Sequence, residues 1–145
     1  MSIHMCVFFS GPLPSQLAVQ HAMHDFGLPF EITDLTRGLD SYGAFMPMTS
    51  GEEEETGTEV YVDPARERIK ELSKSGVAGI DPAFDRAISF RFGGDFMECS
   101  CAYALSAAIA KLTGGAIYDD SEGAVIPIDT ALHRARKCMD IARNG

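Results

Sequence analysis

The sequence predicts a single α+β domain over residues 1–145, with a mixed or antiparallel sheet and about four helices packed mainly on one face. A chain of 145 residues can bury one core and is too short for two ordinary domains. Hydrophobic residues make up 46% and charged residues 23%, as in an average globular protein. Segments with strand and helix periodicity follow in the order β-α-β-β-β-α-β-α-β-β-α, which contains two β-α-β passes with attached hairpins.

The first elements follow from a short apolar run and a helical repeat. Met5–Phe9 ends in a Ser-Gly-Pro turn and predicts a buried strand. Pro14-Ser15 can begin a helix, which Gly27 ends. Its apolar residues recur at helical spacing: Val19, Ala22, Met23 and Phe26. Short β-prone segments then predict three strands, at residues 30–35, 45–48 and 58–62, the last two joined by the polar loop 49–57.

The middle of the chain predicts a helix and a strand. Asp63-Pro64 favours a helix start, with Pro64 at the first helical position, and the helix is expected to run to Lys74. Ile69 and Leu72 are expected to face the core. Residues 88–92 alternate apolar and polar side chains before a glycine pair, which is typical of a half-buried strand.

The last third of the chain predicts two helices around a hairpin. Asp95 is a good N-cap, with Glu98 three residues later, for a helix whose apolar stripe ends at Leu112. Two β-prone triplets flank the acidic turn at 119–123 and predict a hairpin. Asp129 is expected to cap the final helix.

The charge distribution restricts the partners. The net charge is −9, and residues 1–64 hold ten carboxylates and one base, Arg37, whereas residues 65–145 hold eleven charges of each sign. Such a surface repels nucleic-acid phosphate and anionic lipid and attracts basic proteins. We therefore expect no binding to nucleic acid or membrane.

The location is predicted to be cytoplasmic. The first residues lack a basic leader, and their apolar stretch is shorter than a signal-peptide core or a membrane span. In that compartment the four cysteines are expected to be reduced thiols in the core: Cys6, Cys99, Cys101 and Cys138.

No motif predicts a metal, a cofactor or a catalytic residue. The Gly93-Gly94 pair before a helix could bind phosphate, but the chain has no P-loop and no G-x-G-x-x-G, and the carboxylates that follow would repel an anion. A turn with a helix cap is favoured. The acidic turn could bind a cation through Asp119, Asp120 and Glu122, but its spacing does not fit an EF-hand, and aspartate is common in turns.

Three segments carry a resemblance to a known family: residues 56–61 (TGTEVY), 90–98 (FRFGGDFME) and 112–120 (LTGGAIYDD). They resemble the immunity proteins encoded beside bacterial polymorphic toxins, over about residues 42–135. This chain has Phe92 where a typical member has tryptophan before the glycine pair. The resemblance implies inhibition of a cognate toxin by tight stoichiometric binding, with an acidic surface that covers a basic active site.

The expected contact surface combines charge, mobility and an aromatic ring: Glu52, Glu53, Glu54, Glu55, Glu59 and Tyr61. One alternative is a small enzyme acting on a cationic or neutral metabolite, with Glu98 or Asp95 as general base. A second alternative is a structural subunit that associates with itself, for example as a homodimer.

Overall fold

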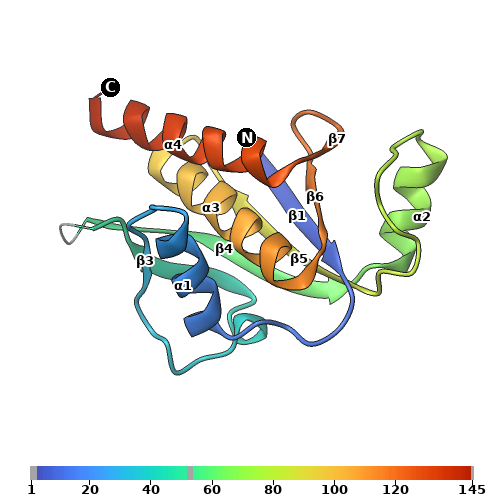
Figure 1. Ribbon diagram of the computed structural model, residues 1–145, viewed down its shortest axis with the longest axis horizontal. Coiled ribbons are helices and arrows are strands. Elements are labelled where there is room, and N and C mark those ends of the chain that lie inside the picture. Colours follow the sequence, from blue (N-terminus) through green and yellow to red (C-terminus); the bar gives the residue numbers. More distant parts are fainter. Residues whose placement is uncertain (1–2, 52–53, 145) are drawn as a thin grey trace.

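The computed structural model describes residues 3–51 and 54–144 as one α+β domain (Figure 1). Its seven strands form one sheet in the order β2-β3-β4-β5-β1-β6-β7. Every neighbouring pair is antiparallel, so the sheet is antiparallel throughout. The predicted order of helices and strands along the chain is confirmed.

The strands are β1 (Ile3–Phe9), β2 (Glu31–Ile32), β3 (Ala44–Thr49), β4 (Glu55–Pro64), β5 (Arg86–Phe92), β6 (Ala116–Asp119) and β7 (Ala124–Ile126). The helices are α1 (Gln16–Asp25), α2 (Arg66–Lys74), α3 (Phe96–Thr113) and α4 (Ile128–Asn144), with a short 3-10 helix, η1, at Leu39–Ser41. Helix α3 links β5 to β6 across the central strand β1. Within the described ranges, no helix has the length and apolar character needed to cross a bilayer.

The sheet has a large core on one face and a small core on the other, because successive residues of a strand point to opposite faces. Met5 and Val7 pack with α1, α3 and α4, whereas Cys6 and Phe8 pack with Ile69 of α2. Three of the four described helices therefore cover one face, as the sequence predicted (Figure 1). Val77, Ile80 and Phe84, in the segment that follows α2, also pack against the small core on the second face.

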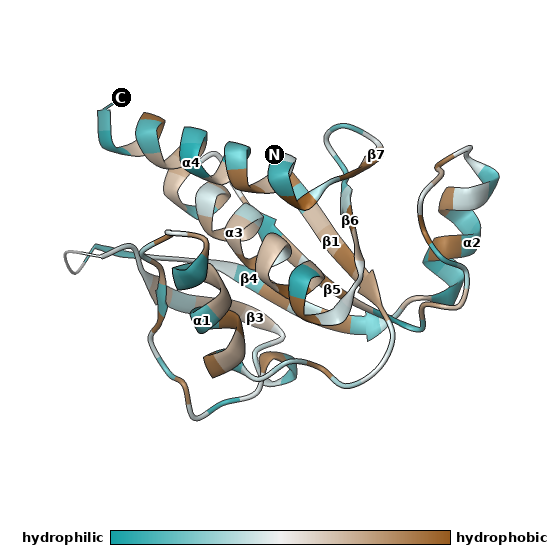
Figure 2. Ribbon diagram, viewed as in Figure 1, coloured by the Kyte–Doolittle hydropathy of each residue, from teal (hydrophilic) through white to brown (hydrophobic). Residues whose placement is uncertain are grey.

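Helix α3 is the centre of the large core. Every residue from Ser100 to Ala110 is buried, and the helix lies between the sheet and the other two helices. Figure 2 shows the contrast with α4, whose outer side is hydrophilic and whose inner side is apolar. A helix that is apolar on all sides is one surrounded by other elements.

Two predicted helix caps are confirmed. The Ser15 side chain accepts a hydrogen bond from the amide of Ala18 at 3.1 Å and begins α1. Asp95 Oδ1 accepts from the amides of Met97 at 2.8 Å and Glu98 at 3.0 Å, so that α3 begins at the expected residue.

Two other predicted helix starts are wrong. Asp63 and Pro64 belong to β4, because its pairing with β5 continues to the end of both strands, and α2 begins at Arg66 after Ala65. Asp129 lies inside the first turn of α4, which begins at Ile128. In the first case, pairing with β5 keeps Asp63 and Pro64 in the strand. This pairing outweighs the propensity of an Asp-Pro pair to begin a helix.

The predicted strand at 30–35 is present only as β2, which pairs with the last two residues of β3. After β2 the Asp34 carboxylate accepts hydrogen bonds from the backbone and side chain of Thr36, which forms a local turn. This side-chain contact competes with strand pairing and ends the segment early.

Candidate functional site

A groove lies where the loop before β4, the start of α3 and the end of α4 meet. It has a volume of about 480 Å³ and is named here the acidic groove. Its lining residues are Glu54, Glu55, Gly94, Asp95, Phe96, Met97, Ile141 and Ala142. Glu55 also lines an adjoining hollow of about 400 Å³, whose other residues include Phe45 and Glu98.

Large apolar side chains are exposed at this end of the domain. Phe96 is 49% exposed, Phe45 45% and Ile141 37%. Phe96 is the first residue of α3, directly after the capping Asp95, and therefore lies before the buried part of the helix. Exposed apolar groups that gather around a hollow mark an interaction surface more often than single ones do.

The Phe45 ring packs against Gly57 of the neighbouring strand β4. A Cβ atom at Gly57 would lie 2.7 Å from the Phe45 ring and 2.2 Å from the carbonyl oxygen of Met46, closer than real contacts allow. Only glycine at this position lets the aromatic ring lie across the neighbouring strand. The local packing therefore fixes where this exposed ring is presented.

The carboxylates around the groove form no ion pair within the described residues. In the described part of the chain, Glu54, Glu55, Asp95 and Glu98 make no salt bridge, whereas the carboxylates of the β6–β7 turn do. The pKa of Glu98 is raised, first by partial burial and then by the negative charges of Asp95 and Glu59. A cationic group bound beside Glu98 would stabilise the ionised form of its carboxyl group.

The raised pKa of Glu98 gives a prediction about stability. Because its pKa is higher in the folded state than in the unfolded state, ionised Glu98 opposes folding. The Glu98→Gln variant should therefore have a higher melting temperature than the wild type at pH 7.5. The gain should fade as the pH falls below the unfolded pKa of about 4.3, where both states are protonated. Thermal unfolding followed by circular dichroism between pH 3.5 and 7.5 checks this, and an equal gain at every pH would contradict it.

The structure separates the residues of the predicted contact surface. Glu52 and Glu53 lie outside the described residues. Glu54 and Glu55 line the acidic groove. Glu59 and Tyr61 lie on the other face of the sheet from α3, because they alternate with the core residue Val60.

Glu59 and Tyr61 form a small polar cluster on the open part of that face. The Tyr61 hydroxyl donates to Glu59 Oε1 at 2.5 Å, and Glu59 lies opposite Phe45 on β3 and Arg91 on β5. The Arg91 guanidinium lies 5.8 Å from the centre of the Tyr61 ring. Phe45 lines the adjoining hollow, and Glu55 lines both that hollow and the groove.

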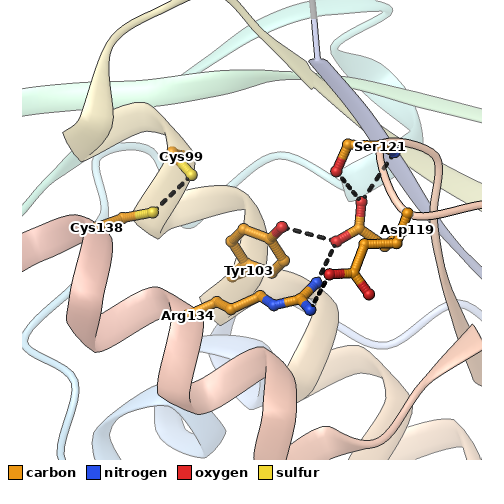
Figure 3. A network of polar contacts seen from close by, with 7 residues as sticks. Cys99, Tyr103, Asp119, Ser121, Arg134 and Cys138 are labelled. Atoms are coloured by element: carbon orange, nitrogen blue, oxygen red, sulfur yellow. Dashed lines mark hydrogen bonds and ion pairs between the residues drawn. The ribbon is translucent and has the colours of Figure 1, made fainter.

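The acidic turn between β6 and β7 has a structural role (Figure 3). Asp119 is fully buried, and its Oδ2 accepts from Arg134 and from the Tyr103 hydroxyl, both at 2.7 Å. Its Oδ1 accepts from the amide and hydroxyl of Ser121, and Arg134 also pairs with Glu122. These carboxylate oxygens are satisfied by protein groups, so the turn joins α3, α4 and the hairpin.

Sequence reasoning missed three residues of this end of the domain: Phe45, Phe96 and Ile141. Phe96 could have been predicted from the sequence. It is a large aromatic residue directly after the helix cap, and it does not belong to the apolar stripe that faces the core. The position of Ile141 beside the loop before β4 depends on the packing of α4 and has no local signal.

The site is suited to non-covalent binding of a cationic segment with apolar side chains. Among residues 3–51 and 54–144, no three His, Cys, Asp or Glu side chains lie close enough together to hold a metal ion.

Compared with known proteins, the sequence matches no family model and no curated protein.

Proposed function

We propose that the chain is an acidic cytoplasmic protein-binding domain that inhibits a cognate bacterial toxin by stoichiometric binding. The observation that carries the proposal is the acidic groove, where carboxylates that form no ion pair among the described residues lie beside exposed Phe96 and Ile141. The resemblance to immunity proteins suggests the class of partner. The net charge of −9 favours one that is basic.

The two kinds of side chain have separate roles in this proposal. The carboxylates attract a basic surface over a distance of about 8 to 10 Å at physiological salt and so raise the association rate. The apolar side chains lose water when the partner docks and so slow dissociation. Glu55 lies where both act, because it lines the groove and the hollow that contains Phe45.

Neutralising the groove should slow association. We expect the double variant Glu54→Gln, Glu55→Gln to bind the partner with an association rate reduced roughly 3- to 10-fold at low salt. The difference should shrink as salt is added, because screening removes the attraction. Stopped-flow or surface plasmon resonance measurements at several salt concentrations check this.

The matched control neutralises two exposed glutamates of α2, Glu67 and Glu71, which lie away from the groove. This variant changes the net charge by the same amount. If both double variants slow association equally, the effect comes from the total charge and the groove has no special part.

A second candidate function is general-base catalysis on a cationic or neutral metabolite. The observation that favours it is Glu98, a carboxyl with a raised pKa in a hollow of about 400 Å³. Screening the purified protein against amine and guanidine metabolites tests it. Turnover that is lost in Glu98→Gln would support the enzyme, and turnover unchanged in that variant would exclude Glu98 as the base.

A further inference from the structure

Two cysteines that are distant in the sequence face each other between α3 and α4. The sulfur atoms of Cys99 and Cys138 are 2.8 Å apart, although the residues are separated by 39 positions (Figure 3). The bond in a disulfide is about 2.05 Å long, so a shift of less than about 1 Å would join them.

Polar contacts hold the two helices close at this point. The Ser100 hydroxyl donates to the carbonyl oxygen of Ala135 at 2.6 Å, and both groups are buried. One turn further along, Tyr103 of α3 and Arg134 of α4 meet at the Asp119 carboxylate. The approach of the two sulfur atoms is therefore part of a fixed helix contact.

Solvent reaches this pair and not the other two thiols. Cys99 and Cys138 are partly exposed, whereas Cys6 and Cys101 are fully buried. Burial raises the pKa of Cys6 and of Cys101 to about 12, so these thiols stay protonated and unreactive. The expectation that the cysteines are core thiols thus holds for two of the four.

The two facing thiols differ in acidity. The pKa of Cys138 is lowered, first by the hydrogen bond with Cys99 and then by the positive charges of Lys137 and Arg134. The pKa of Cys99 is raised by the same hydrogen bond and by burial. Cys138 is therefore the thiol that ionises first and attacks an oxidant.

We propose that Cys99 and Cys138 are a reversible disulfide site that a small-molecule disulfide such as glutathione disulfide oxidises. The Cys138 thiol loses its proton to solvent, and the thiolate attacks one sulfur of glutathione disulfide, which forms a mixed disulfide and releases one glutathione thiolate. Cys99 then loses its proton to solvent, and its sulfur attacks the Cys138 sulfur and releases the second glutathione thiolate. Two protein thiols are oxidised, one glutathione disulfide is reduced, and the two released thiolates take up the two protons.

The disulfide would tie the C-terminal helix to the centre of the core. It closes a loop of 39 residues, which restricts the unfolded chain. We expect the oxidised protein to melt roughly 5 to 15 °C above the reduced protein. The site lies about one helical turn from two residues that line the acidic groove, Phe96 on α3 and Ile141 on α4.

The test incubates the full chain with excess glutathione disulfide, quenches with acid, and measures the intact mass and a non-reducing peptide map. The expected product has lost two hydrogen atoms, carries no glutathione, and contains one peptide pair that joins Cys99 to Cys138. The Cys99→Ser variant should instead keep glutathione on Cys138, because the second step is blocked. Cys101→Ala, on the same helix, should form the disulfide as the wild type does.

A wild-type chain that stays reduced, or that gains glutathione without a cross-link, would overturn the proposal. The wild-type peptide map needs no substitution, so it decides even if Cys99→Ser fails to fold. No toxin is present in the assay, so a negative result leaves the proposed function untouched, and a failure to find a toxin leaves the disulfide untouched.

Discussion

Replacing Asp119 with alanine is expected to lower the free energy of unfolding by about 3 to 5 kcal/mol, as is usual when one partner of a buried ion pair is removed. The Asp119 side chain has no exposed surface, and its two oxygens accept hydrogen bonds from Tyr103, Ser121 and Arg134. Alanine would leave these donors without their acceptor and the guanidinium without its buried counterion. Chemical denaturation followed by circular dichroism measures the loss.

The neighbouring residue provides the matched control. Asp120 carries the same charge, but its side chain is 50% exposed and its contacts with His4 and Arg68 are long, at 3.8 and 4.0 Å. Asp120→Ala should cost less than about 1 kcal/mol, as exposed ion pairs do. Similar losses in the two variants would show that burial of the Asp119 network adds little.

Replacing Phe96 with alanine is expected to weaken binding of the partner roughly 30-fold, or about 2 kcal/mol, as truncation of a central aromatic anchor does. Phe96 is half-exposed in the free protein and lies in the acidic groove, so a docked partner would cover its ring. Because the ring is not part of the core, the melting temperature should change little. Most of the loss of affinity should appear as a faster dissociation rate, measured by surface plasmon resonance.

Leu112 provides the control for Phe96. It lies on the same helix and is 44% exposed, but it is about 24 Å away along the helix axis. Leu112→Ala should leave the affinity unchanged. An equal loss of affinity in both variants would point to a general effect of the helix surface and against an anchor in the groove.

The fold was predictable from the sequence where local signals and tertiary packing agree. The sequence predicts helix starts at Ser15 and Asp95, and both residues cap helices in the structure. The buried stripe of α3 likewise follows from its apolar residues. Prediction failed where pairing between strands outweighed local preference. Pro64 is the clearest example, because its pairing with Arg86 keeps it in β4 although proline also suits a helix start.

The candidate site was predictable only in part. The acidic character and two of its members, Glu54 and Glu55, follow from the charge pattern, and the structure places both in the groove. Glu59 and Tyr61 are close in sequence to them and share the sheet face of Glu55, yet they lie further along β4 and do not line the groove. A pattern read along the chain cannot show which segments a fold brings together.

The cysteines illustrate the same limit. Cys99 and Cys101 are close in sequence, but the sulfur that Cys99 meets belongs to Cys138, on another helix. The sequence therefore predicted four reduced core thiols and no pair. Only the packing of α3 against α4 shows the pair.

The central claim is that the acidic groove binds a basic protein, and parallel affinity capture from the native cell lysate tests it most directly. Three tagged proteins would be compared at low and high salt: the wild type, the groove variant Glu54→Gln, Glu55→Gln, Phe96→Ala, and the control variant Glu67→Gln, Glu71→Gln, Leu112→Ala. We predict that the wild type and the control each capture one basic protein at a near one-to-one molar ratio, and that high salt weakens this capture. The groove variant should not capture that protein. Capture of the same protein by the groove variant, or recovery of the wild type alone, would contradict the account.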